Sequence, residues 1–364
     1  MVIGFLLFKK DVQGYDLAME NSQLEYDEIQ DVIDHILSKD NQFSFSEYIS
    51  DLISGKEIFS YTEVINKSKE GVVIELKSNT GNFTALIAIA IIAAVFTNLS
   101  AAFKNNQVAD TGFYITYLLL FTILTSSFVA ASKIAVTTLT SIFDFMKVLI
   151  PSYIMALAFS TGVTTSYVFY QSTLFLISFI DFLLLKIIIP MINIHFIITI
   201  ADNLSKEDKL SKLSELLSQG VSWSLKSVLT LVIGLNATQG LISPVLDRVK
   251  RTGILKTAEA IPGIGDILGG VTESVLSASI LLKNAIGIAG VVVIMVVCAV
   301  PLLKLGVTTL IYKISSAFVQ PISDKRLINC ISATANAAGL LLHTVFVAVV
   351  LFVITITIIA VTTT

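Results

Sequence analysis

The sequence predicts an all-α, polytopic helical membrane protein with about 6–8 transmembrane helices and a small helical N-terminal domain. Hydrophobic residues make up 54% of the chain and charged residues only 14%, and the mean hydropathy is +0.84. A typical soluble domain carries about 25% charged residues. Apolar segments of bilayer-spanning length recur from Phe83 onward. A lipid bilayer is the environment that can cover so much apolar surface.

Charge divides the chain into two parts. Residues 1–82 hold fifteen Asp or Glu and seven Lys or Arg, whereas residues 83–364 hold twelve acidic and seventeen basic residues. This asymmetry predicts an acidic, water-facing N-terminal region at 1–82 and a multi-pass membrane domain at 83–364. The sequence contains no basic block, so we expect no nucleic-acid partner.

The N-terminal region begins with a short apolar run. Residues 1–10, MVIGFLLFKK, place two lysines after the run rather than before it, which fits either the remnant of a signal peptide or an ordinary apolar terminus. Apolar residues then recur at helical spacing over 22–40 and 43–54, and this predicts two short amphipathic helices. Their apolar faces can pack on each other, on the membrane surface or on a partner, and packing on each other is the commonest outcome.

The membrane domain contains a series of long apolar segments. Segments of spanning length occur at Phe83–Phe103, Thr111–Ala131, Tyr167–Ile200, Val221–Ile242 and Leu327–Ala360. Ile134–Met146 is less apolar and is either interfacial or leads into Val148–Thr161, where Pro151 would kink the helix. Tyr167–Ile200 exceeds one span and contains Pro190, which predicts a long tilted helix, a broken helix or two half-spans.

Two polar segments set the expected topology. Asp202–Gln219 has leucines on one side and charges on the other, a pattern typical of a helix that lies along the membrane surface or packs on a neighbour. Ser243–Lys256 is the most basic loop, and cytoplasmic loops collect Lys and Arg. We therefore place this loop inside and the N-terminal region outside.

The stretch Ile261–Pro321 combines three features. Its glycine cluster predicts a turn through which the chain re-enters the membrane. Thr272–Leu282 is a predicted amphipathic helix that ends at a Lys-Asn pair, which we expect in an aqueous path or a subunit contact. Two further glycines permit close helix approach, and a proline predicts a kink in the apolar span. The structural or conduit candidates are Gly263, Gly265, Gly269, Gly270, Lys283, Asn284, Gly287, Gly290 and Pro301.

Asp181 and Lys186 are two further candidates, because they are ionisable residues within an apolar segment. Charges at membrane depth mark a pathway or a pairing. Residues five apart do not share a face of an α-helix, so we expect each to pair with another helix. Lys226 and Lys304 lie near span ends, where lysines extend to the headgroups.

The sequence offers one enzymatic alternative. Residues 263–266, GIGD, match the GxGD motif of intramembrane aspartyl proteases, which need a second aspartate such as Asp144 or Asp181. The glycine cluster fits neither G-x-G-x-x-G nor the P-loop pattern. Cys298 and Cys330 are predicted to act as small hydrophobic residues. We predict no catalytic, cofactor-binding or metal-ligating residue, and a stand-alone secondary permease is the other alternative.

The order of residues in the C-terminal half resembles a known family. The run from Ser277 contains S-x-S-x-L-L-K-N-x-x-G-x-A-G, then C-A-x-P-x-L-K and Y-K-x-x-x-A-x-x-Q-P. In this order the three patterns resemble stage III sporulation protein AE of endospore-forming Firmicutes. Gln239-Gly240 and the segment before Phe103 are also similar, so the resemblance covers roughly Thr84 to Thr364.

The resemblance implies a non-enzymatic, multi-pass protein of the mother-cell membrane that surrounds the forespore. Members of the family are expected to belong to the stage III A complex. With stage II protein Q, that complex is thought to form a channel or feeding tube that supports forespore development and late forespore gene expression. The implied partners are other stage III A membrane proteins and, indirectly, stage II protein Q. The family normally carries a cleavable signal peptide, of which residues 1–10 are at most a remnant.

Overall fold

The computed structural model describes residues 26–36, 43–55, a set of helical positions between 73 and 95, and then 106–161, 163–204, 209–258 and 265–362. Within these residues the chain forms helices and no strands. The all-α prediction is therefore confirmed for the described part of the chain.

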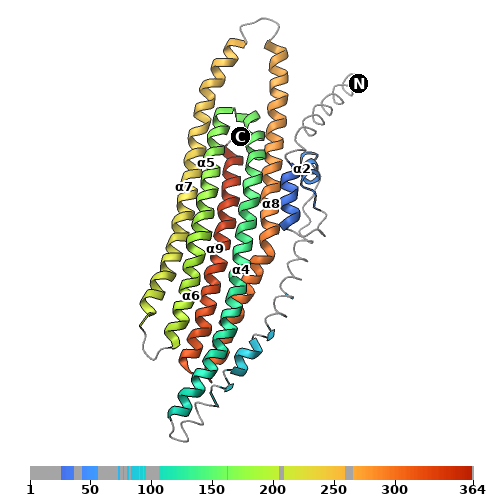
Figure 1. Ribbon diagram of the computed structural model, residues 1–364. Coiled ribbons are helices and arrows are strands. Elements are labelled where there is room, and N and C mark those ends of the chain that lie inside the picture. The colour runs from blue at the N-terminus through green and yellow to red at the C-terminus, as the bar shows by residue number, and fades with distance from the viewer. Residues whose placement is uncertain are drawn as a thin grey trace.

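Long antiparallel helices form the body of the molecule (Figure 1). In chain order they are α4 (Asn106–Thr161), α5 (Val163–Asp181), the π-helix η1 (Phe182–Ile188), α6 (Ile189–Leu204), α7 (Ser211–Ala258), α8 (Gly265–Val319) and α9 (Lys325–Thr362). α9 contacts α4, α6, α7 and α8. In an apolar 18-residue stretch of α9, 56% is buried inside the bundle, whereas the corresponding value for α7 is 22%. α9 is therefore the central helix.

Five described helices are long and apolar enough to cross a membrane: Tyr114–Ala158, Ser166–Asn203, Ser211–Thr238, Ser277–Val319 and Lys325–Ala360. The polytopic prediction is thus confirmed. The predicted span Phe83–Phe103 is helical at 83–89, 91–92 and 94–95, and its other positions lie outside the described residues. α4 has 56 residues and α8 has 55, or roughly 80 Å at 1.5 Å per residue. Both helices therefore extend well beyond one hydrocarbon core of about 30 Å.

The three segments predicted between Thr111 and Thr161 form one helix, so the predicted division of this region is wrong. The polar residues that suggested an interruption are accommodated within the helix. Ser132 donates a hydrogen bond to Asn193 of α6 at 3.1 Å, and Lys133 lies on the exposed face. Pro151 also lies inside α4. The region Tyr167–Ile200 is likewise helical throughout, with η1 between α5 and α6.

The predictions for two polar segments are also corrected. The surface helix expected at Asp202–Gln219 is instead the α6–α7 connection and the first turns of α7. Asp202 Oδ1 accepts a hydrogen bond from the Leu210 backbone N–H at 2.7 Å, which helps to start α7. The basic segment Ser243–Lys256, expected as a loop, lies within α7.

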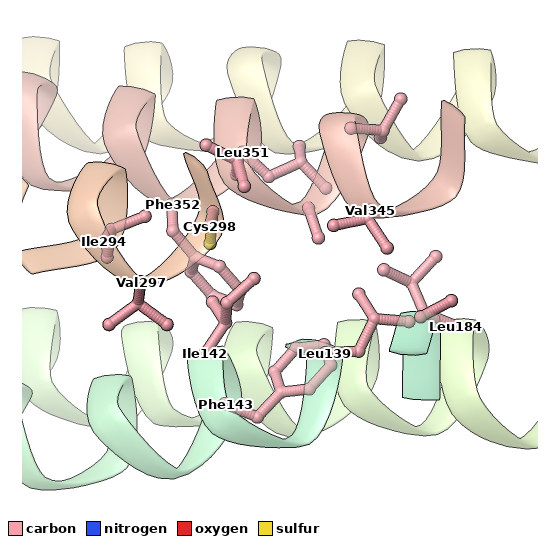
Figure 2. Close-up of a cluster of buried hydrophobic side chains, with 14 of the residues drawn as sticks. Leu139, Ile142, Phe143, Leu184, Ile294, Val297, Cys298, Val345, Leu351 and Phe352 are labelled. Carbon is pink, nitrogen blue, oxygen red and sulfur yellow. The ribbon is translucent and has the colours of Figure 1, made fainter. Parts of the chain in front are cut away.

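The core is built where α4, η1, α8 and α9 meet (Figure 2). Phe143 and Phe352 lie edge to face with ring centroids 5.4 Å apart, and Phe128 stacks on Phe196 of α6 at 3.9 Å. Such aromatic contacts add packing energy to area burial. Side chains in this core include Leu139, Ile142, Leu184, Ile294, Val297, Cys298, Val345 and Leu351.

Two short N-terminal helices pack on each other, as the sequence predicts. Residues 26–36 are helical, and α2 covers Phe45–Ile53. Tyr26 lies edge to face with Phe45, and Gln30 accepts a hydrogen bond from the Phe45 N–H while donating to the Phe43 carbonyl. α2 in turn lies against α8 (Figure 1).

Candidate functional site

Lys283 is buried where the apolar part of α8 begins. Its side chain is 0% exposed, and its Nζ donates a hydrogen bond to the Ala360 carbonyl at 3.2 Å. Ala360 lies in the last turn of α9, where carbonyls have no donor within the helix and carry the negative end of the helix dipole. Lys283 therefore caps α9 from another helix, in place of the aqueous position considered from the sequence.

Gly287 and Gly290 lie one and two turns after Lys283 on α8. A methyl group added at Gly290 would lie 2.5 Å from Leu149 Cδ2 of α4, and one added at Gly287 would lie 3.4 Å from the Tyr153 ring. Both positions also face Ile356 of α9. These glycines thus sit at close approaches between α8, α4 and α9, as small residues do at membrane helix interfaces.

The remaining candidates on or just before α8 are Asn284, Pro301 and the glycine cluster. Asn284 and Pro301 are half-buried, and the helix continues through Pro301. Gly265, Gly269 and Gly270 belong to the first turns of α8, so the turn predicted over this cluster is wrong from Gly265 onward. Glycine costs a helix only about 1 kcal/mol relative to alanine, which a helix of this length tolerates. Gly263 lies outside the described residues.

Four charged residues lie on α4 and on or beside η1, and three of them are in contact. Lys147 Nζ lies 3.1 Å from Asp181 Oδ2 and 3.9 Å from Asp144 Oδ1. Asp181 immediately precedes η1, and Lys186 lies in the last turn of η1. We call Asp144, Lys147, Asp181 and Lys186 the mid-bundle charged patch. Asp181 does pair with another helix, but Lys186 is exposed and makes no such contact in the described residues.

The π-helix changes the relation between Asp181 and Lys186. In an α-helix, residues five apart point roughly 140° away from each other. A π-helix is closed by hydrogen bonds between residues five apart, as between the Ile189 N–H and the Leu184 carbonyl. Its wider turn brings such residues closer to one face. The expectation that the two do not share a face assumed α-helical geometry, which this segment does not have.

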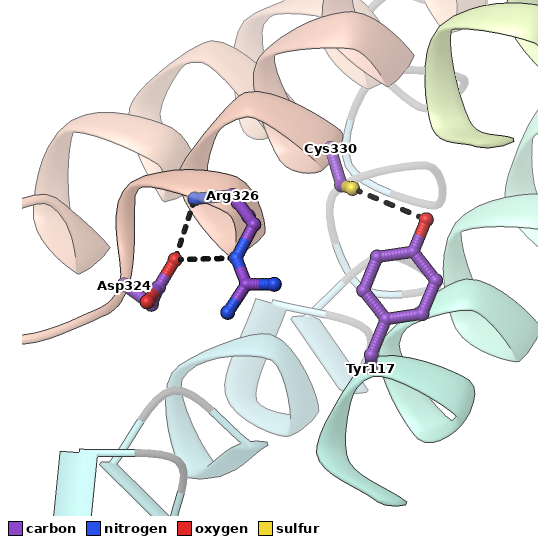
Figure 3. Close-up of polar contacts among 4 residues, drawn as sticks. All are labelled: Tyr117, Asp324, Arg326 and Cys330. Atoms are coloured by element: carbon purple, nitrogen blue, oxygen red, sulfur yellow. Dashed lines mark hydrogen bonds and ion pairs between the residues drawn. The ribbon is translucent and has the colours of Figure 1, made fainter. Parts of the chain in front are cut away.

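Polar contacts also join helices at the opposite end of the bundle from Lys283. The Tyr117 hydroxyl of α4 donates to the Ile200 carbonyl of α6, and Cys330 Sγ of α9 lies 3.7 Å from the same hydroxyl (Figure 3). Asp324 Oδ1 accepts from the Arg326 N–H at 2.8 Å and from its Nε at 3.4 Å, at the start of α9. Tyr117 was missed, because a tyrosine in an apolar run has no sequence signature that names its acceptor.

Two further polar contacts have partners that the sequence does not identify. His195 of α6 lies 3.0 Å from both the carbonyl and the hydroxyl of Ser214 in α7. Asn236 of α7 donates to Thr355 Oγ1 of α9 at 3.1 Å. Both contacts join neighbouring helices, as polar side chains do inside membrane bundles. Among the residues that the structure describes, no group of three His, Cys, Asp or Glu could hold a metal ion.

The fold and its polar contacts define a multi-pass helical membrane protein whose buried polar residues join helices to one another. The chain belongs to the stage III sporulation protein AE family, whose model matches residues 43–363. A relative, stage III sporulation protein AE of Bacillus subtilis (strain 168), is 28% identical over 290 residues, which cover 79% of this chain and 73% of the relative. No solved structure matches the chain. The resemblance is confirmed, and the family match begins at residue 43, well before Thr84.

Proposed function

We propose that this chain is a non-enzymatic membrane component of the stage III A channel complex, in the mother-cell membrane around the forespore. Its partners would be the other stage III A membrane proteins and, indirectly, stage II protein Q. Family membership supports a role in sporulation, and five candidate spans support a place in a membrane.

The observation that carries this proposal is the extent of the family match. Residues 43–363 include α2 and every helix from α4 to α9. Because α2 lies against α8, the match covers the membrane bundle together with a helix from the acidic N-terminal region. The proposed role is therefore assigned to the whole described bundle, which would act as a platform for partner proteins.

The arrangement of the aspartates supports the non-enzymatic part of the proposal. An aspartyl protease needs two carboxyl groups close enough to share a proton. Asp144 and Asp181, the two candidates to partner Asp266, both contact the Lys147 ammonium. Both carboxylates are thus already engaged by the same lysine of α4. We therefore expect Asp266 to be dispensable.

Deletion and complementation in the organism that encodes the chain test both parts. We expect deletion to abolish heat-resistant spores, with a block after engulfment. Wild type and Asp266→Ala should restore spore counts equally. Normal sporulation in the deletion strain would overturn the sporulation role. Failure of Asp266→Ala at normal protein levels would overturn the non-enzymatic part alone.

A further inference from the structure

The mid-bundle charged patch lies within two candidate spans. Asp144 and Lys147 belong to Tyr114–Ala158, and Asp181 and Lys186 belong to Ser166–Asn203. Each of the four is more than ten residues from either end of its span. The patch is open to the outside of the bundle, and the Asp144 side chain is 55% exposed. Lipid tails offer no partner to a charge, whereas a second protein surface can supply charges of the opposite sign.

Asp144 shares its cation with Asp181, and Lys186 has no ion pair among the described residues. Lys147 Nζ lies 3.1 Å from Asp181 Oδ2 but 3.9 Å from Asp144 Oδ1, so its closer ion pair is with Asp181. Lys186 makes no ion pair or hydrogen bond in the part of the chain that the structure describes. The four charges sum to zero. A surface that carries both positive and negative charges and no net charge can pair with an identical surface. The positive groups of one copy then meet the negative groups of the other, and there is no net repulsion.

The two exposed charges, Asp144 and Lys186, lie at similar depths. The Lys147–Asp181 contact fixes the register of the antiparallel α4 and α5–η1 (Figure 1). Asp144 precedes Lys147 by three residues, about 4.5 Å along the helix, and Lys186 follows Asp181 by five, at most about 7.5 Å in the same direction. Copies in one membrane share one orientation, so a residue meets only residues at its own depth. Asp144 of one copy can therefore meet Lys186 of another.

Aromatic side chains extend the same face. Phe175, Phe179 and Phe182 precede Lys186 at spacings of four, three and four residues, and all three are exposed. The rings of Phe175 and Phe179 stack with centroids 6.5 Å apart. Large aromatic residues beside a charge are typical of the energetically dominant part of an interface.

We propose that a second copy of this chain packs against the mid-bundle charged patch. In this assembly Asp144 of each copy pairs with Lys186 of its neighbour, and the row of Phe175, Phe179 and Phe182 packs alongside. This inference concerns self-association and does not depend on the proposed sporulation function.

Charge reversal on separate chains provides the test. Two differently tagged full-length copies are expressed together and purified in mild detergent, and co-purification and native mass are measured. Asp144→Lys alone and Lys186→Asp alone should each lower self-association at least tenfold, because like charges then face each other. A mixture of the two variants should recover wild-type association, since each lysine again meets an aspartate. Lys226→Asp, an exposed lysine on α7, should have no effect.

The mixture separates contacts between chains from contacts within one chain, because an intramolecular pair stays broken in both variants. A monomeric wild type, unaffected single variants or failure of the mixture would overturn the proposal. If a reversed chain does not accumulate, Asp144→Cys and Lys186→Cys on separate chains with a short bis-maleimide replace it. A cross-link between the two tagged chains is expected. A cross-link only to a different protein would overturn the proposal.

Discussion

The Nζ of Lys283 and the carbonyl oxygen of Ala360 lie 3.2 Å apart, although 77 residues separate them in the chain. This contact joins the start of the apolar part of α8 to the last turn of α9, the central helix. A buried ammonium is costly unless its donors are used. The contact therefore ties the end of α9 to α8 and supports a structural role for Lys283.

Lys283→Met should loosen the end of α9. The substitution keeps an unbranched side chain but leaves the Ala360 carbonyl without this donor, a loss of about 1–3 kcal/mol when the acceptor stays buried. We expect hydrogen exchange over 355–362 to rise at least fivefold. Lys304→Met, at a half-buried lysine on the same helix, should leave this exchange unchanged. Equal protection in both variants would show that Lys283 does not hold the helix end.

The double substitution Lys283→Leu/Asn284→Leu should block sporulation after engulfment while the protein still accumulates. The physical reason is the loss of the hydrogen bond from Lys283 to the Ala360 carbonyl, which caps the end of α9. Heat-resistant spore counts and immunoblots of the membrane fraction measure the two parts. Normal spore yield with normal protein levels would remove the case for this pair.

Gly290→Ala should destabilise the bundle by about 1–3 kcal/mol, the usual cost of overpacking. The added methyl group would lie 2.5 Å from Leu149 Cδ2, so that side chain must move. Gly306→Ala on the same helix meets nothing within 4 Å and should gain up to about 1 kcal/mol in helix propensity. Thermal unfolding in detergent compares the two variants. Equal melting temperatures would contradict the close packing of α8 on α4.

Tyr117→Phe should cost about 1 kcal/mol, because it removes the hydroxyl that donates to the Ile200 carbonyl and contacts Cys330. The ring itself is retained, so packing is preserved. Tyr167→Phe, at an exposed tyrosine on α5, is the matched control. A loss of stability in both variants, or in neither, would mean that the Tyr117 hydroxyl does not join α4, α6 and α9.

The sequence predicts the helical class well because composition and apolar length report directly on a bilayer environment. It also predicts the two N-terminal helices, since amphipathic spacing at 22–40 and 43–54 reflects the faces that pack. Gly287 and Gly290 also predict close helix approach from the sequence alone, because a residue without a side chain lets two backbones come close together.

Other features depend on information that no local pattern carries. The acceptor of Lys283 is a backbone carbonyl of a distant helix, and every residue type has such a carbonyl. The relation between Asp181 and Lys186 depends on a π-helical segment, whereas periodicity assumes α-helical turns. Helix ends were placed at Ser132–Lys133 and at the glycine cluster, where local polarity and flexibility are overcome by packing along continuous helices.

Purification of the tagged full-length chain from sporulating cells tests the central claim most directly. Membranes are solubilised in mild detergent after engulfment, and mass spectrometry identifies the proteins that co-purify. We expect other stage III A membrane proteins in the eluate, and none from a strain that carries an unrelated tagged multi-pass protein. Recovery of the chain without any stage III A protein, from cells that produce them all, would contradict it.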